Sequence, residues 1–236
     1  MPSKIKVAIL EDHQIVADGY AFRLQDPAAF EIVGIASIYS DWEPLLATHP
    51  ADIALMDVKV PTAPDNPDPY PILRVMPQLI QAYPDMAFLV ISAHAEPTLI
   101  QGVMKAGANG YILKDDNALL RELKNVLVSV VAGRGIYLSP QAKELLLQRE
   151  AVGAELGLTP RQIEALSLCA TYPIDSTKDL ALRMNVSFST LRNLLSQSYL
   201  RLGVSGRSAA VLRAQQLGLL NPVEDPLQGV VQPPTG

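Results

Sequence analysis

The first half of this 236-residue chain alternates short apolar runs with longer segments of helical periodicity. Short runs rich in β-branched residues predict strands, and apolar residues spaced three and four apart predict helices. The expected strands are 4–10, 30–36, 53–57, 87–92 and 110–113. The expected helices are 13–25, 41–49, 72–82, 97–106 and 117–132. Strands and helices that alternate in this way predict one doubly wound parallel sheet of five strands.

The second half shows a purely helical pattern from Leu158 onward and predicts an all-α domain. Thr159, Ser176 and Ser187 each precede an apolar helical pattern, and Ser and Thr are residue types that cap helices. A fourth helix is expected at 207–217. This half therefore predicts a small bundle of short, capped helices.

The segment between the halves carries its own boundary signals. A Gly-Arg-Gly sequence ends the first unit, and Ser139-Pro140 has the residues that begin a helix, which is expected to reach about Glu150. The tail is rich in Pro and Gly, which predicts disorder. The expected parts are an α/β domain at 1–132, a linker with a helix at 133–157, a helical domain at 158–220 and a disordered tail at 221–236.

The net charge of −5 is unevenly distributed along the chain. Residues 1–135 contain ten Lys and Arg against sixteen Asp and Glu, which is a net charge of −6. Residues 156–220 contain seven against three, which is a net charge of +4. An acidic first part and a basic later part predict two domains with different partners.

The chain lacks the signals of a secreted or membrane protein. Cys169 is the only cysteine, which excludes an intramolecular disulfide. The apolar run at the N-terminus is too short for a signal peptide, and no apolar stretch approaches the roughly 20 residues that cross a bilayer. We therefore expect a cytoplasmic protein with no membrane partner.

Polar residues stand where four of the expected strands end. Glu11 and Asp12 follow the first strand, and Asp57 ends the third. Ser92 ends the fourth strand, and Lys114 follows the fifth. Because ligands bind at the carboxyl ends of such strands, we expect these side chains to converge. Three carboxylates can hold Mg²⁺, with which Asp57 can act as a nucleophile toward a phosphoryl group.

These residues, together with the stretch ISAHAEPTLIQGVMKAGANGYILKDD, make residues 4–132 resemble the CheY-like receiver domain of bacterial response regulators, which has a flavodoxin-like fold. The resemblance implies that a sensor histidine kinase phosphorylates Asp57. The metal-binding residues that it implies are Glu11, Asp12, Asp57 and, through its backbone carbonyl, Lys59. The phosphoryl-contacting and switch residues that it implies are Ser92, Lys114 and Tyr111.

Other interpretations of the acidic residues remain open. A flavodoxin-like domain can carry incidental acids at its strand ends. Hydrolases of the haloacid dehalogenase type also place a nucleophilic Asp after a strand, but they normally have a second Asp two residues later, where this chain has Lys59. We expect no enzyme activity beyond Mg²⁺-dependent self-phosphorylation from a phosphodonor and self-dephosphorylation. His13 and His94 flank the site, and the sequence assigns neither a chemical role.

The segment Pro61–Pro71 departs from the receiver pattern. It is longer than the usual loop, lacks a glycine and contains five prolines. Proline fixes φ and disfavours helix in the residue before it, so we expect a stiff, extended loop. It is either a tolerated surface insertion or a partner-specific or water-excluding flap. Asp65 and Asp68 are expected to be solvated and not metal ligands.

Residues 158–220 resemble the LuxR-type helix-turn-helix of NarL/FixJ regulators. The matching pieces are Leu158-Thr159 with Arg161, Lys178-Asp179-Leu180-Ala181, Ser187 with Thr190-Leu191-Arg192, and Arg201-Leu202-Gly203-Val204 with Arg207. The resemblance implies that the helix at 188–203 enters the major groove of double-stranded DNA. Leu191, Leu195 and Leu202 form its inner stripe. The expected DNA-contacting residues are Lys178, Ser189, Thr190, Arg192, Asn193 and Ser196.

Two features depart from this second pattern. Leu194 stands where family members often have a histidine, and the connection Thr171–Asp175 is longer than usual and has no glycine. Both leave the strength of DNA binding open. The last helix, 207–217, has an apolar face that serves either contact between two DNA-binding domains or packing within its own domain. That face consists of Ala210, Val211, Ala214 and Leu217.

The two resemblances predict a two-component response regulator. Its phosphorylation is expected to cause dimerisation, or release of the basic domain, and binding to a two-fold operator, with a homodimer expected on activation. One alternative is a receiver that acts by protein contacts, with the helical domain as an interaction module. Another is a regulator that binds DNA independently of phosphorylation. The sequence does not specify the kinase, the operator, the target genes or the direction of regulation.

Overall fold

The computed structural model describes residues 4–133 and 136–220. The chain divides between Leu146 and Leu147 into two compact units, so the boundary falls inside the predicted linker at 133–157. The predicted disordered tail, 221–236, lies outside the described residues. No helix of the described part combines the length and the apolar character needed to cross a membrane.

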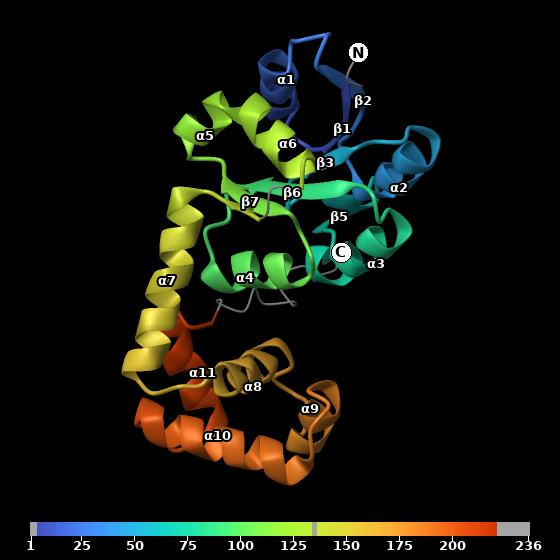
Figure 1. Ribbon diagram of the computed structural model, residues 1–236. Coiled ribbons are helices and arrows are strands. Elements are labelled where there is room, and N and C mark those ends of the chain that lie inside the picture. Colours follow the sequence, from blue (N-terminus) through green and yellow to red (C-terminus); the bar gives the residue numbers. More distant parts are fainter. Residues whose placement is uncertain (1–3, 134–135, 221–236) are drawn as a thin grey trace, which may run out of the picture. The chain divides into compact units, whose positions relative to one another are not determined.

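A parallel sheet of six strands forms the centre of the first unit (Figure 1). In spatial order the strands are β2 (Phe30–Ala36), β1 (Ile5–Leu10), β3 (Ile53–Met56), β6 (Ala87–Ser92), β7 (Gly110–Leu113) and β8 (Tyr137–Leu138). The chain moves outward from β1 to β2 and then returns past β1 to β3. The predicted doubly wound topology is confirmed, and its switch point places a ligand-binding edge at the carboxyl ends of β1 and β3.

Each face of the sheet has its own hydrophobic core. Successive residues of a strand point to opposite faces, so Ala8 and Leu10 of β1 lie in one core and Val7 and Ile9 in the other. The helices over the first core are α2 (Tyr39–Thr48), α3 (Ile72–Ala82) and α4 (Pro97–Lys105). The helices over the second core are α1 (Gln14–Arg23), α5 (Asn117–Arg121) and α6 (Leu123–Val131). Figure 1 shows the two sets on opposite sides of the sheet.

The sheet has one strand more than the five that the sequence predicts. In β8, Tyr137 donates its N–H to the Asn109 carbonyl at 2.8 Å, and Ser139 just beyond donates to the Tyr111 carbonyl at 3.0 Å. Gly110 permits this approach, because a Cβ atom there would lie 2.5 Å from the Tyr137 carbonyl oxygen. A strand of two residues has no periodicity, so the pattern of the sequence could not reveal it.

Two helices also differ in extent from the prediction. The expected helix 117–132 is divided at Glu122, whose N–H bonds to the Leu119 carbonyl and whose ψ of 17° leaves the α-helical range. The interruption is local, because apolar residues on both sides of it pack in the same core. Helix α7 (Pro140–Glu155) begins at the predicted residues but continues beyond Glu150.

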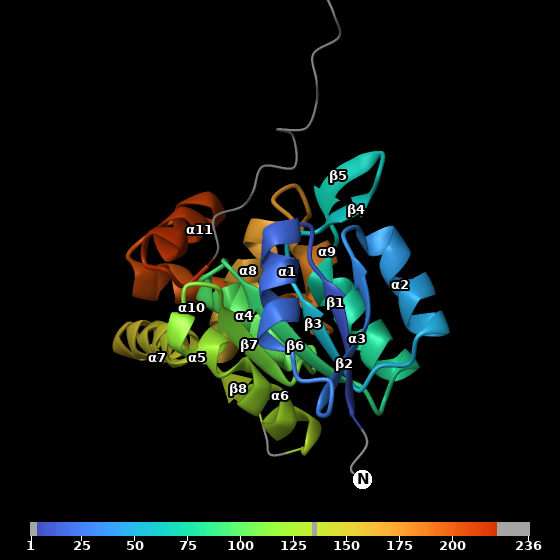
Figure 2. The ribbon, with the colours of Figure 1, turned by 90° about the horizontal axis from the view of Figure 1, so that it is seen from above.

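The proline-rich segment after β3 folds into an antiparallel hairpin, which projects from the first unit in Figure 2. Its strands are β4 (Pro61–Ala63) and β5 (Asn66–Pro69). Since prolines have no N–H to donate, a side-chain bond of 2.8 Å from Thr62 Oγ1 to the Asp68 carbonyl supplements the pairing. The segment is extended as predicted, whereas the pairing of its two halves was not predicted.

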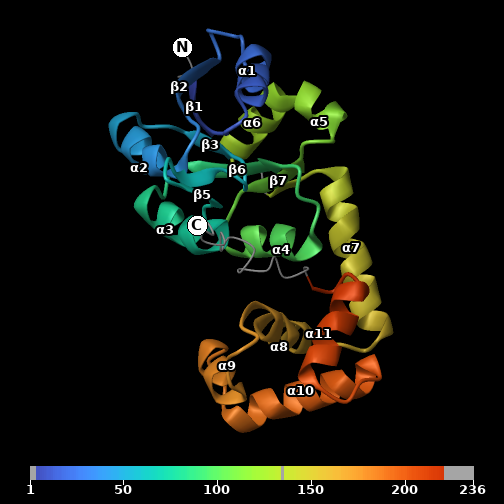
Figure 3. The ribbon, with the colours of Figure 1, turned by 180° about the vertical axis from the view of Figure 1, so that it is seen from behind.

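The described residues after Leu158 form four helices, seen together in Figure 3. They are α8 (Pro160–Thr171), α9 (Thr177–Arg183), α10 (Phe188–Leu202) and α11 (Arg207–Gln216). Helix α10 contacts each of the other three. Thr159, Ser176 and Ser187 cap α8, α9 and α10 through their side-chain oxygens, as predicted.

The apolar face of α11 is directed mainly into its own unit. Ala210 and Ala214 are fully buried in the core of the four helices. Val211 and Leu217 are only partly buried and pack against the same core. These contacts favour packing within the domain over the alternative of a contact between two DNA-binding domains.

Candidate functional site

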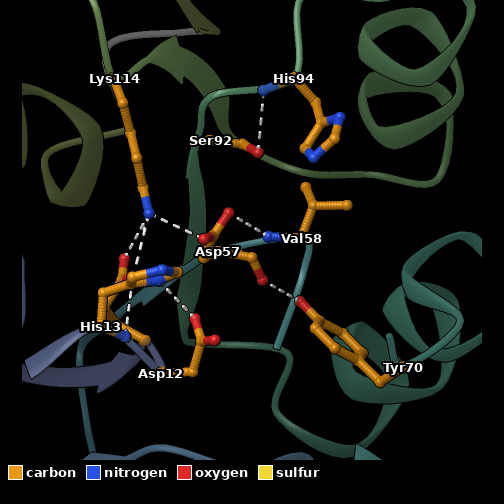
Figure 4. Close-up of polar contacts among 9 residues, drawn as sticks. Asp12, His13, Asp57, Val58, Tyr70, Ser92, His94 and Lys114 are labelled. Carbon is orange, nitrogen blue, oxygen red and sulfur yellow. Dashed lines mark hydrogen bonds and ion pairs between the residues drawn. The ribbon is translucent and has the colours of Figure 1, made fainter. Parts of the chain in front are cut away.

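The carboxyl edge of the sheet brings together three of the residues that the sequence predicts to converge. Glu11 follows β1, Asp57 follows β3 and Lys114 follows β7. The Lys114 Nζ atom lies 2.8 Å from Glu11 Oε2. The same atom lies 2.7 Å from Asp57 Oδ2 (Figure 4). A single ammonium group therefore joins two carboxylates that are distant in the sequence.

These charges are largely removed from water. Glu11 is 2% exposed and Asp57 is 6% exposed. Burial raises the pKa of Glu11, and the hydrogen bond from Lys114 offsets this only in part. Burial alone would lower the pKa of Lys114, but its bonds to Asp57 and Glu11 outweigh burial and raise that pKa. One partly buried cation thus faces two buried carboxylates, which leaves negative charge for a further cation to neutralise.

Asp12 and His13 complete a group of possible metal ligands with Glu11 and Asp57. One ligand atom from each of the four residues lies within 4.8 Å of the other three. The His13 Nδ1 atom lies 2.9 Å from Asp12 Oδ1. Mg²⁺ prefers carboxylate oxygens, so the donor set and its negative charge fit this ion. His13 was assigned no chemical role from the sequence, and its position after the acidic pair is the only signal that could have identified it.

The predicted switch residues are connected through the backbone of His94. Ser92 and Tyr111 are both fully buried. The His94 N–H donates to Ser92 Oγ at 3.3 Å, and the Tyr111 hydroxyl donates to the His94 carbonyl at 2.8 Å. Burial raises the pKa of Tyr111, so its hydroxyl stays protonated as a donor. Sequence reasoning missed this role of His94 because it depends on backbone atoms and not on residue type.

Sequence reasoning also missed Tyr70, which lies between β5 and α3. Its hydroxyl donates to the Asp57 backbone carbonyl at 2.6 Å (Figure 4). Its ring stacks on Tyr39 with the ring centres 4.7 Å apart and the planes 7° from parallel. Lys59, whose carbonyl the receiver resemblance assigns to the metal, is an exposed residue two positions after Asp57. No pattern in the proline-rich segment indicated that its one tyrosine would reach the acidic site.

In the second unit, helix α10 has the two faces that the sequence predicts. Leu191, Leu195 and Leu202 are buried in the core. The six residues predicted to contact DNA are all exposed: Lys178, Ser189, Thr190, Arg192, Asn193 and Ser196. The hydroxyls of Ser189 and Thr190 also lie within hydrogen-bonding distance of the capping Ser187 hydroxyl. The start of α10 is therefore both a capped helix end and an exposed polar surface.

The basic residues of 156–220 fall into two groups. Four of the seven donate hydrogen bonds within the unit: Arg161 to Glu164, Arg183 to Asp175, Arg201 to Gln162, and Arg207 to the Asp175 carbonyl and to Thr177. The other three, Lys178, Arg192 and Arg213, make no hydrogen bond or ion pair with any described residue. Two of these three belong to the predicted DNA-contacting set.

The two departures from the helix-turn-helix pattern have structural explanations. Leu194 is partly buried and packs against the core, which suits an apolar side chain. The longer connection 171–175 is fixed at its end, because Asp175 accepts bonds from Arg183 at 2.8 Å and from Arg207 at 2.6 Å. The Arg183 guanidinium also lies 3.8 Å from the centre of the Tyr172 ring.

Comparison with known proteins indicates the class of protein that the sequence predicts, the response regulators. A model of the response regulator receiver domain matches residues 7–124. The transcriptional regulatory protein DegU of Brevibacillus brevis is 27% identical over 238 residues, covering 92% of this chain and 95% of that protein. The probable transcriptional regulatory protein NarL of Mycobacterium tuberculosis is 28% identical, covering 93% and 98%. The solved structure of RcsB from Salmonella typhimurium has a TM-score of 0.59 at 20% identity, covering 91% and 99%.

A doubly wound sheet with an acidic carboxyl edge, followed by a helical unit, is the architecture of a receiver with an attached output domain. The chain belongs to the response regulator receiver family. Its similarity to DegU and NarL along nearly its whole length confirms the predicted relation to NarL/FixJ regulators. These relatives are named as regulators and not as catalytic enzymes, which agrees with the prediction on that point.

Proposed function

We propose that the protein is a DNA-binding transcriptional regulator whose Asp57 accepts a phosphoryl group from a sensor histidine kinase. The observation that carries this proposal is the buried contact of Asp57 with Lys114, beside Glu11, in a chain that matches the receiver domain over residues 7–124. A carboxylate that only started a turn would be solvated and would need no lysine to neutralise it.

The side chains divide the proposed chemistry among them. Asp57 Oδ1 accepts the Val58 N–H at 2.6 Å, and we assign the attack on phosphorus to Oδ2, which must first leave its contact with Lys114. As the bond between Oδ2 and phosphorus forms, the bond between phosphorus and the histidine nitrogen of the kinase breaks. Lys114 then pairs with a phosphoryl oxygen. Mg²⁺, when bound by Glu11, Asp12, Asp57 and the Lys59 carbonyl, supplies positive charge that stabilises the transferring group. A small phosphodonor can replace the kinase, and water can later remove the phosphoryl group.

The proposed switch runs through the contacts of His94. Ser92 donates to the phosphoryl group once its hydroxyl turns away from the His94 N–H, which alters the segment after β6. Tyr111 shares that segment through its bond to the His94 carbonyl. A phosphorylation switch requires a two-state element of this kind, whose equilibrium the new charge biases.

For the output, we propose homodimers of the domain at 158–220 on a two-fold operator. RcsB has been solved bound to promoter DNA in the presence of the phosphomimetic BeF₃⁻, and as two dimers bound to two DNAs. In this chain the exposed Arg192 and Asn193 suit base contacts, and Lys178 suits phosphate. The proposed receiver comprises residues 1–132, and the proposed linker comprises residues 133–157. We also propose that the protein is cytoplasmic, because a bacterial regulator binds chromosomal DNA there.

The decisive experiment combines phosphorylation with DNA selection. The full-length protein is incubated with acetyl phosphate and Mg²⁺ and then tested for binding to a pool of random duplexes. We expect a single phosphoryl group, lost in Asp57→Ala and retained in the control Asp68→Ala, and selection of a two-fold site. Labelling that survives Asp57→Ala overturns the assignment. Binding without any sequence preference favours the interaction-module alternative, and selection unaffected by phosphorylation favours the phosphorylation-independent regulator.

A further inference from the structure

Tyr70 links the inserted hairpin to the proposed phosphoacceptor. The residue follows β5 directly and is 2% exposed. Its hydroxyl donates to the Asp57 carbonyl at 2.6 Å, and its backbone N–H donates to the Val60 carbonyl at 3.1 Å. One residue therefore holds both ends of the turn 57–60, which joins β3 to the hairpin.

The hydroxyl bond acts on the peptide unit that orients the Asp57 carboxylate. The Asp57 carbonyl and the Val58 N–H belong to one planar unit, so fixing one fixes the other. The Val58 N–H donates to Asp57 Oδ1 at 2.6 Å. Tyr70 thus fixes the carbonyl, the carbonyl fixes the N–H, and the N–H holds the carboxylate. Two residues after Asp57, the same turn carries the backbone carbonyl of Lys59, the proposed metal ligand.

The ring of Tyr70 is itself firmly placed. It stacks on Tyr39 of α2, and β4 of the hairpin also contacts that helix. Burial raises the pKa of Tyr70 well above its ordinary value, so the hydroxyl stays protonated and able to donate. The hydroxyl can therefore be tested apart from the ring, because phenylalanine preserves the stacking and removes only the donor.

We propose that Tyr70 is a positioning residue for phosphoryl transfer, which sets the orientation of the Asp57 carboxylate and of the turn that carries the Lys59 carbonyl. The proposal rests on the proposed function of Asp57. It also assigns the hairpin a role, since the insertion supplies the residue that orients the phosphoacceptor. A merely structural tyrosine, which only anchored the hairpin through its ring, would leave Mg²⁺ binding and phosphorylation unchanged when its hydroxyl was removed.

The test compares Tyr70→Phe with Tyr39→Phe in the full-length protein. The two rings belong to one stack, but the Tyr39 hydroxyl donates to Glu43 Oε1 on the surface of its own helix. Titration calorimetry measures the Mg²⁺ affinity, and phosphorylation at several acetyl phosphate concentrations separates the maximal rate from the half-saturating concentration. We expect Tyr70→Phe to weaken Mg²⁺ binding by about tenfold, the lower end of the usual range for ligand-supporting residues. Its maximal rate should fall, with the half-saturating donor concentration unchanged.

The outcomes separate this inference from the function on which it rests. Mg²⁺ affinity and maximal rate that are equal in wild type and Tyr70→Phe overturn the role of Tyr70, while a phosphorylated wild type keeps the proposed function intact. Equal losses in Tyr39→Phe also overturn it, because they assign the effect to the stack. A wild type that neither binds Mg²⁺ nor accepts phosphate overturns both. Thermal unfolding of each variant shows that it is folded.

Discussion

The two units of the molecule use charge in opposite ways. At the acidic edge of the first unit, Glu11, Asp57 and Lys114 are largely buried and bonded to one another. On the exposed face of the second unit, Lys178 and Arg192 extend into solvent and make no hydrogen bond or ion pair with any described residue. In the first arrangement the charges are bonded to one another within the fold, whereas in the second the positive charges remain exposed to solvent.

This difference in burial predicts how each region responds to substitution. Buried charges interact strongly in a low dielectric, and removing one leaves its partners without compensation. Exposed charges are screened by salt and contribute little to the stability of the fold. Substitutions at the acidic edge should therefore alter stability and function together, and substitutions on the exposed face should alter binding alone.

The largest effect is expected for Lys114→Met, which leaves two buried carboxylates facing each other. Without Mg²⁺ the free energy of unfolding should fall by about 3 kcal/mol, the size of effect seen when a buried ion pair loses one member. Mg²⁺ should then restore more stability to the variant than it adds to the wild type, because it replaces the missing positive charge. Urea unfolding with and without Mg²⁺ measures both quantities.

The matched control is Lys105→Met, which removes an exposed lysine at the end of α4. It should change stability by no more than about 0.5 kcal/mol and leave the response to Mg²⁺ unaltered. Equal stability of the Lys105 and Lys114 variants would contradict the description of the acidic edge as a coupled buried network.

The next effect concerns Arg192 and Lys178, the cations of the proposed DNA surface that bond to no described residue. Arg192→Ala should remove about 1–3 kcal/mol of discrimination at one or two base pairs of each half-site. Lys178→Ala should weaken binding to all sequences and make the salt dependence shallower by about one unit. Titrations on operator and scrambled duplex at several salt concentrations measure both. The control Arg213→Ala removes the same charge from α11 and should change neither the base discrimination nor the salt dependence. An equal loss of binding in Arg213→Ala would mean that total charge, and not position, determines DNA binding.

A smaller effect is expected for Arg207→Ala, which removes one of the engaged cations of the second unit. Arg207 donates to the Asp175 carbonyl and to Thr177 Oγ1. Loss of these bonds should lower the free energy of unfolding by about 1–2 kcal/mol. Chemical denaturation should show almost no change for Arg192→Ala, since Arg192 bonds to none of the residues that the structure describes. If Arg192→Ala lowered the free energy of unfolding more than Arg207→Ala, the distinction between structural and exposed cations would be wrong.

The smallest effect is a change in the pH dependence of stability in Glu11→Gln. Burial raises the pKa of Glu11 in the folded state, so its contribution to stability is complete below the ordinary value of 4.5 and is lost as pH rises through the raised pKa. The stability of the wild type relative to Glu11→Gln should therefore fall as pH rises above 4.5 and then become constant. Urea unfolding across this range tests the sign, and a difference that grows with pH would contradict it.

Much of the acidic edge could be predicted because parallel strands place their carboxyl ends at one edge. That rule brings Glu11, Asp57 and Lys114 together from the alternation of strands and helices alone. It gives no information on atoms that reach the site from elsewhere. Tyr70 arrives from the hairpin, and its contact depends on how two proline-rich strands pair. His94 contributes backbone atoms, which no residue type reveals.

The alternation of five strands and five helices, the capped helix starts at Thr159, Ser176 and Ser187, and the two faces of α10 could all be predicted from the sequence. Each of these follows from local periodicity or from bonds that span three or four residues. The folded chain alone reveals the sixth strand, the pairing of the hairpin, and which cations of the second unit are engaged. Those features depend on contacts between residues far apart in the chain, such as Tyr70 with Asp57 or Arg207 with Asp175. Such contacts stabilise the protein only after folding has closed the loop between the two residues, so a local sequence pattern does not reveal them.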